Sequence, residues 1–195
     1  MEEVRTFVAI ELSASIKSEL TRVQEMLKEK IATPHLRWAD PANVHLTLKF
    51  LGNVPLDRIQ EITAALKEAC AGLSPFIMDV SGLGCFPSTN NPRVIWVGVQ
   101  EETGRLKRLQ EGVEESLATL GFKPERRPFR PHLTLGRVRK QAHGGARRII
   151  GGIVSATSVG DLGQMEVGEI SLMKSVLLPS GAQYSCLEMI ALEGG

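Results

Sequence analysis

NVHLTLKFLG (residues 43–52) and FRPHLTLGRV (residues 129–138) contain the same tetrapeptide, His-Leu-Thr-Leu. The chain of 195 residues has only four histidines, so half of them occupy this repeated setting. The two copies lie close to half a chain length apart. A motif repeated at such a distance indicates two similar halves, each of which contributes one histidine.

Each tetrapeptide is expected to lie on a β-strand, where successive side chains point to opposite faces. The leucines would then enter the core beneath helices, and His45 and Thr47 would share the opposite face. His132 and Thr134 would do the same in the second copy. If the fold brings these strands side by side, two imidazoles and two hydroxyls line one cleft.

The pattern around the motifs predicts one α+β unit with two similar lobes over residues 1–195, and argues against a doubly wound parallel sheet. The expected strands cover residues 6–12, 44–51, 76–86, 93–99, 132–138, 169–178 and 182–192. We expect a first helix after a cap at Ser13 or Ser15, with Ile16, Leu20, Val23 and Leu27 at helical spacing. Two further helices are expected over residues 59–69 and 103–120. We expect Gly52 to Pro55 to break the second strand, and the closing hairpin to turn at PSG (179–181). Glycines and β-branched residues leave 144–164 ambiguous.

The composition is that of an ordinary globular protein, with 43% hydrophobic and 23% charged residues. The acidic N-terminus and the lack of a long apolar run predict neither a signal peptide nor a membrane span. The three cysteines, Cys70, Cys85 and Cys186, lie far apart, which predicts free thiols. We therefore expect a cytoplasmic protein without a membrane partner.

The charges are unevenly distributed, although the formal net charge is only +1. Residues 123–148 contain nine basic residues and one acidic residue, which leaves the remainder of the chain at −7. Such a block is either a solvated face or a surface that attracts a polyanion. The second histidine motif lies inside it, which favours phosphate binding.

Two imidazoles at one site suit proton transfer at a phosphodiester. One imidazole can take a proton from water while the other gives a proton to the departing oxygen, and each transfer contributes about 10²–10⁴-fold. The Thr47 and Thr134 hydroxyls can donate hydrogen bonds to phosphoryl oxygens. A metal site is disfavoured because two histidines supply only two ligands, so we expect neither metal nor cofactor. The structural alternative to a catalytic pair is an ancient duplication that left two core strands alike.

Other residues near the motifs allow two readings each. Arg130 lies on the His132 side of an extended chain, where it either binds a phosphate oxygen or is one solvated member of the basic block. Phe50 and Trp38 either stack on a base or belong to the core. The remaining histidines, His35 and His143, fall in expected loops without a paired hydroxyl.

The paired His-x-Thr-x motifs resemble those of the 2H phosphoesterase superfamily. More closely, RTFVAIEL, WADPANVHLTLKFLG, FRPHLTLGR and LLPSGAQYSCLE resemble the bacterial and archaeal RNA 2′,3′-cyclic phosphodiesterases, the LigT-like proteins formerly called 2′-5′ RNA ligases. The resemblance extends from about Arg5 to Leu192. It implies a bilobal fold of two pseudo-symmetric antiparallel-sheet lobes with outer helices and a central cleft.

The resemblance also implies an activity, namely metal-independent hydrolysis of a 2′,3′-cyclic phosphate at an RNA end to a 2′-phosphate, with weak reversible 2′-5′ ligation. His45 would be the proton donor to the leaving 3′ oxygen, and His132 the proton acceptor that activates water. Thr47 and Thr134 would hold the phosphate. From the residues alone, either histidine could take either role. The expected partner is RNA with a cyclic phosphate end, bound by a monomer. Two alternatives stay open: a small nucleotide cyclic phosphate as substrate, and a module that only binds RNA or nucleotide phosphate.

Overall fold

The computed structural model describes residues 2–178 and 181–194. The strands are β1 (Glu3–Glu11), β2 (Leu36–Trp38), β3 (His45–Pro55), β4 (Phe76–Phe86), β5 (Val94–Gln100), β6 (His132–Val138), β7 (Asp161–Val167), β8 (Glu169–Leu178) and β9 (Gly181–Ala191). The helices are α1 (Ala14–Lys30), α2 (Ile59–Cys70), α3 (Arg105–Thr119) and α4 (Gly144–Ala156), with 3-10 turns η1 (Pro41–Asn43) and η2 (Leu56–Arg58).

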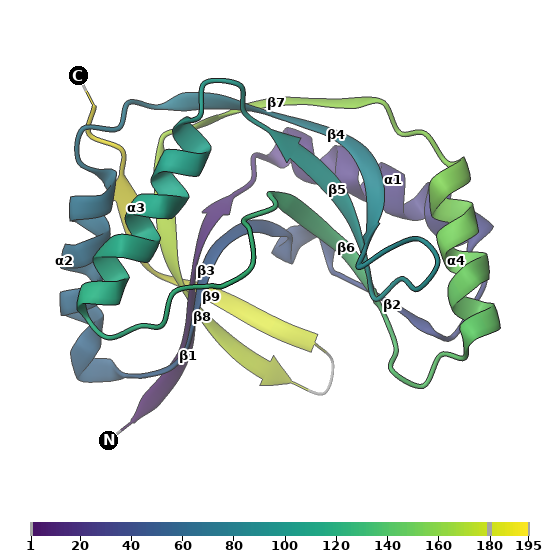
Figure 1. The fold of residues 1–195 in the computed structure, drawn as a ribbon, viewed down its shortest axis with the longest axis horizontal. Coiled ribbons are helices and arrows are strands. Elements are labelled where there is room, and N and C mark those ends of the chain that lie inside the picture. Colours follow the sequence, from purple (N-terminus) through teal and green to yellow (C-terminus); the bar gives the residue numbers. More distant parts are fainter. Residues whose placement is uncertain (1, 179–180, 195) are drawn as a thin grey trace.

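Two antiparallel sheets form the centre of the molecule (Figure 1). The strand order is β3-β1-β8-β9 in the first sheet and β2-β6-β5-β4-β7 in the second. Each sheet takes strands from both halves of the chain, because β8 and β9 join the first sheet and β2 and β4 join the second. A strand and a helix precede each motif strand: β1 and α1, followed by the short β2, precede β3, and β5 and α3 precede β6. The predicted α+β fold with two similar antiparallel lobes is therefore confirmed.

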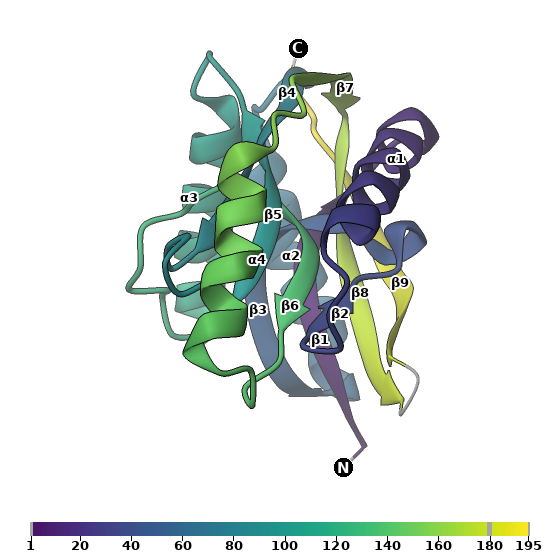
Figure 2. The ribbon, with the colours of Figure 1, turned by 90° about the vertical axis from the view of Figure 1, so that its right-hand side faces the viewer.

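The helices cover the outer sides of the two sheets (Figures 1 and 2). Helices α2 and α3 pack against the first sheet, where α2 contacts β9 and α3 contacts β3. Helices α1 and α4 pack against the second sheet, where they contact β7 and β4. Helix α1 begins where the sequence predicts, because the Ser13 hydroxyl accepts a hydrogen bond from the Ile16 amide. Its apolar stripe is buried at helical spacing: Ile16, Leu20, Val23 and Leu27.

Both motif strands contain a β-bulge directly after the histidine and threonine. The pairing of β3 with β1 skips Leu48, and the pairing of β6 with β5 skips Leu135. A bulge shifts the alternation of side chains by one residue. Phe50 and Arg137 therefore share the face of their motif's histidine and threonine. Gln24 on α1 donates a hydrogen bond of 2.8 Å to the Leu135 carbonyl and so supports the second bulge.

One predicted strand end is wrong. The chain does not leave the sheet at Gly52, because β3 continues to Pro55 and Gly52 pairs with Thr6 of β1. Gly52 has a φ of +78°, which a glycine adopts without strain, so it permits a second irregularity in the pairing rather than a break. The short strand β2 falls in a region for which no strand was predicted.

The ambiguous stretch 144–164 contains helix α4 and the start of β7. The helix is capped by the His143 imidazole, which accepts a hydrogen bond of 3.2 Å from the Ala146 amide. At Gly151 an added Cβ would lie 1.7 Å from the Thr89 carbonyl oxygen. The glycine that weakens the helix is thus required for its close packing. Of the predicted closing turn, Pro179 and Ser180 lie outside the described residues.

Candidate active site

The motif histidines are the first residues of β3 and β6. These strands belong to different sheets, yet they contact each other. Leu46 and Leu48 are 1% and 4% exposed, whereas His45 and Thr47 are half-buried on the opposite side of β3. The second motif repeats this pattern in β6. The predicted alternation is confirmed, and we call the side that carries His45 or His132 the histidine face of its sheet.

Each imidazole is held by a backbone carbonyl two residues earlier. The Nδ1 atom of His45 lies 2.9 Å from the Asn43 carbonyl oxygen, and that of His132 lies 2.7 Å from the Arg130 carbonyl oxygen. A carbonyl oxygen only accepts, so Nδ1 carries the proton in each neutral ring. The Nε2 atom of each ring is then the one that exchanges a proton with a substrate.

Aromatic rings pack against both imidazoles. Phe7 of β1 stacks on His45 at 4.6 Å between ring centroids, and Tyr184 of β9 meets the same ring edge-on at 5.1 Å. Phe86 of β4 meets His132 edge-on at 4.9 Å. These contacts restrict rotation of the two imidazoles, so each ring is fixed by packing as well as by its carbonyl.

Both imidazoles favour the neutral state. Burial lowers the pKa of His45 below the usual imidazole range, partly opposed by the hydrogen bond to Asn43. Burial also lowers the pKa of His132, and the positive charge of Arg137 adds to this shift. The same guanidinium contributes to the lowered pKa of His45. Arg137, carried by the second sheet, therefore lies within electrostatic reach of both rings, so the two histidine faces are near each other.

Arg137 is the residue of the candidate site that sequence reasoning missed. An uninterrupted strand would turn it away from His132 and Thr134, because it lies five and three positions beyond them, and odd offsets point to opposite faces. The bulge at Leu135 restores it to the histidine face. The sequence feature that could have indicated the bulge is Gly136, directly before Arg137. In the structure, an added Cβ at Gly136 would lie 3.2 Å from the Arg37 carbonyl oxygen of the adjacent strand.

The other candidates occupy different places. Arg130 precedes β6, its side chain is exposed, and its carbonyl holds His132. Phe50 is 62% exposed on the histidine face, whereas Trp38 packs against the core. His35 and His143 lie together, with ring centroids 5.6 Å apart, and His143 caps α4.

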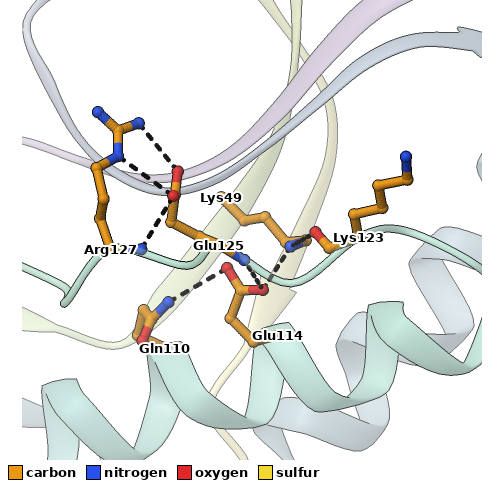
Figure 3. Close-up of polar contacts among 6 residues, drawn as sticks. All are labelled: Lys49, Gln110, Glu114, Lys123, Glu125 and Arg127. Carbon is orange, nitrogen blue, oxygen red and sulfur yellow. Dashed lines mark hydrogen bonds and ion pairs between the residues drawn. The ribbon is translucent and has the colours of Figure 1, made fainter.

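The loop that leads into the second motif, residues 121–131, is anchored to the first motif strand (Figure 3). Lys49, directly after the first motif, is buried and donates to the Glu114 carboxylate of α3 and, at 2.9 Å, to the Lys123 carbonyl oxygen. Glu114 also accepts from the Glu125 amide at 3.2 Å and from the Gln110 side chain. One ion pair thus ties β3, α3 and this loop together.

The described residues include no group of three histidine, cysteine or acidic side chains arranged to hold a metal ion. Burial raises the pKa of the Cys70 and Cys85 thiols to about 11, so neither is a ready nucleophile. None of the helices described here combines the length and the apolar character needed to cross a bilayer.

Two lobes that each present a histidine–threonine strand are the arrangement of the 2H phosphoesterases. The family model described as LigT like Phosphoesterase matches the chain twice, over residues 10–96 and 97–184. The chain belongs to this family of hydrolases. The double match follows the internal repeat.

Individual relatives agree with this assignment over nearly the whole chain. A protein of Archaeoglobus fulgidus named RNA 2′,3′-cyclic phosphodiesterase is 36% identical over 95% of this chain and 99% of its own length. The crystal structure of TT0787 from Thermus thermophilus superimposes with a TM-score of 0.78 at 26% identity, covering 97% and 98% of the two chains. That of Escherichia coli LigT in complex with 3′-AMP gives 0.72 at 26% identity, covering 98% and 99%.

Proposed function

We propose that this protein hydrolyses the 2′,3′-cyclic phosphate at an RNA end to a 2′-phosphate, by paired-histidine catalysis without a metal. The observation that carries the proposal is the matched pair of imidazoles, each with Nδ1 bonded to a carbonyl and Nε2 left for proton exchange. The relative from Archaeoglobus fulgidus bears the name of this activity.

In the proposed step, water attacks phosphorus and the bond from phosphorus to O3′ breaks. The Nε2 atom of His132 takes the proton from water, and the protonated Nε2 of His45 gives its proton to O3′. This division of roles follows the family precedent. The products are a 3′-hydroxyl and a 2′-phosphate, and the two histidines regain their starting states by exchange with solvent. Weak 2′-5′ ligation is the same chemistry with an RNA hydroxyl in place of water.

The proposed phosphate ligands are Thr47, Thr134 and Arg137. The threonine hydroxyls lie two residues beyond each histidine on the same face, and they can donate to the non-bridging oxygens. The Arg137 guanidinium, within electrostatic reach of both imidazoles, opposes the negative charge of the phosphoryl group. For the Arg130 side chain we propose a weaker part, attraction of RNA through the basic block, because the side chain is exposed.

The test uses an oligonucleotide that ends in a 2′,3′-cyclic phosphate, incubated with the protein in EDTA. The expected product carries a 2′-phosphate only, because protonation of O3′ by one fixed acid selects which ring bond breaks. Absence of ring opening would refute the proposed activity. Loss of activity in EDTA that returns with a divalent metal would refute the metal-independent mechanism. A mixture of 2′- and 3′-phosphates would contradict the assigned geometry of acid and base.

A second candidate substrate is a small nucleotide cyclic phosphate. It is favoured by the complex of Escherichia coli LigT with 3′-AMP, in which a relative accommodates a mononucleotide. The same residues would then act, and only the group attached to the ribose would differ.

A further inference from the structure

Arg37 lies directly opposite Arg137 on the second sheet. Strand β2 pairs antiparallel with β6, and the register places Arg37 against Arg137 and Leu36 against Val138. Leu36 and Val138 are both 7% exposed and belong to the core. Because neighbouring side chains of a strand point to opposite faces, the two arginines share the histidine face.

Two like charges at directly opposed positions of a sheet destabilise it. Arg37 and Arg137 are both exposed, and within the described residues no carboxylate forms an ion pair with either of them. The fold therefore accepts a repulsive pair beside its histidines. An anionic ligand between or beside the guanidinium groups would remove the repulsion.

The two arginines do not reach the same place. Arg137 contributes to the lowered pKa of both imidazoles, whereas Arg37 lies on β2, the edge strand of the second sheet. The guanidinium of Arg37 extends instead to the first sheet, where its Nη2 lies 3.3 Å from the position of a Cβ added to Gly181. Arg37 thus lies one strand closer to the sheet edge than Arg137, and next to the start of β9.

The β8–β9 hairpin offers apolar surface at the same place. Leu178 pairs with Gly181 and is 44% exposed, and its neighbour Leu177 is 65% exposed. Leu177 follows Met173 and Ser175 on the face of β8 that carries Phe7 in the adjacent strand, which is the histidine face of the first sheet. A guanidinium beside an apolar surface suits a nucleotide, which combines a phosphate with a base.

We propose that Arg37 binds the phosphate that links the terminal nucleotide to the one before it. This inference rests on the proposed function and names its substrate class: an RNA end with at least one internucleotide phosphate, preferred over a free nucleoside cyclic phosphate. Paired strands place the Cα atoms of opposed residues about 5 Å apart, so these two long side chains can hold neighbouring phosphates. Arg137 serves the cyclic phosphate and Arg37 serves the next one.

The experiment compares kcat/KM for two substrates, a nucleoside 2′,3′-cyclic monophosphate and a dinucleotide that ends in a 2′,3′-cyclic phosphate. Arg37→Gln should lower the value for the dinucleotide by about tenfold or more, the worth of a hydrogen bond to a charged group, and leave the monophosphate within about twofold. The loss should fall mainly on KM, since this phosphate does not react. Arg108→Gln removes the same charge from an exposed position on α3, outside the basic block, and it should change neither value.

Two outcomes would overturn the inference, and a third would refute the proposed function. An equal loss for both substrates would mean that Arg37 acts on the reacting phosphate or on folding, and would overturn it. An equal loss for the dinucleotide in Arg37→Gln and Arg108→Gln would reduce it to general charge attraction and overturn it as well. If the wild-type protein turns over neither substrate, the proposed function itself fails.

Discussion

At the scale of single residues, the doubled histidine is explained by the two protons that a phosphodiester exchange moves. Each imidazole is oriented by a carbonyl on Nδ1 and by an aromatic ring, and each is kept from protonating by burial. A neutral imidazole cannot donate the proton that the leaving oxygen needs, so the donor histidine must be protonated. Because its pKa is lowered, it becomes protonated at a lower pH than an exposed histidine does. This has a direct consequence for the pH dependence of catalysis.

We predict a bell-shaped profile of kcat/KM with its maximum below about pH 6.5, the usual imidazole pKa. The rate should fall at low pH as the base is protonated, and at high pH as the acid loses its proton. Because both pKa values are lowered, both limbs shift to the acid side. Initial rates on a cyclic-phosphate oligonucleotide between pH 4 and 9 measure this. A flat profile, or a maximum above about pH 7.5, contradicts it.

Arg137→Met should move both limbs of that profile to higher pH and lower the overall rate. Burial remains the main cause of the lowered pKa values, but the variant removes the positive charge that both imidazoles share as a further cause. The same pH series on the variant provides the measurement, and Arg108→Met, at an exposed position outside the basic block, is the matched control. Limbs that stay in place while the rate falls would restrict Arg137 to phosphate binding.

The placement of histidine and threonine could be predicted because a strand alternates with a period of two. Arg137 could not, since the bulge at Leu135 breaks that period and depends on contacts with Gln24 and β5, far away in the chain. For Arg130 the spacing allows either a phosphate contact or a solvated side chain. The contact of its carbonyl oxygen with His132 depends on the backbone conformation before β6, which the amino-acid sequence alone does not specify.

At the scale of elements, the ion pair of Lys49 and Glu114 links the strand of one histidine to the loop that leads into the other (Figure 3). The side chain of Lys49 is 3% exposed and that of Glu114 is 15% exposed. A charge buried to this degree must stay paired. The pair therefore fixes where the second motif begins relative to the first.

Glu114→Gln should destabilise the protein by about 3 kcal/mol, since it leaves the Lys49 ammonium buried without a counter-charge. Lys49→Met combined with Glu114→Gln should recover part of this loss. Denaturant unfolding of the single and double variants measures both effects, and Glu111→Gln, an exposed position on the same helix, is the control. A single variant as stable as the wild type would show that the pair contributes nothing to anchoring the loop.

Element boundaries were predictable where local signals agreed with the fold. Ser13 caps α1 as expected, but the glycines of α4 misled, because Gly151 serves a tertiary contact with the loop at Thr89. Gly52 misled about the end of β3 for the opposite reason: its positive φ occurs inside the strand, which continues to Pro55. In each case the local cost of glycine was clear from the sequence, and the compensating contact was not.

At the scale of the whole molecule, the sheets exchange strands between the halves of the chain, which supports our proposal that residues 1–195 act as one domain. The net charge of +1 conceals a basic block around the second motif and a remainder of −7. Such an asymmetry attracts a polyanion to one side of the protein.

Longer RNA should therefore show a steeper salt dependence than a dinucleotide. Binding that neutralises several phosphates releases their counterions, so kcat/KM for a cyclic-phosphate oligonucleotide should fall with salt several times more steeply on a logarithmic scale. The comparison uses both substrates between about 50 and 200 mM salt. Equal slopes would mean that the basic block does not contact RNA beyond its end.

Single substitution of His45 or His132 shows whether the two imidazoles perform the reaction together. Turnover of a cyclic-phosphate oligonucleotide in EDTA should fall by about 10²–10⁴-fold in His45→Ala and, separately, in His132→Ala. His35→Ala, which removes a histidine from the pair near α4, should retain wild-type turnover. Turnover that survives either motif substitution unchanged, with the variant folded, would rule out catalysis by this pair of histidines.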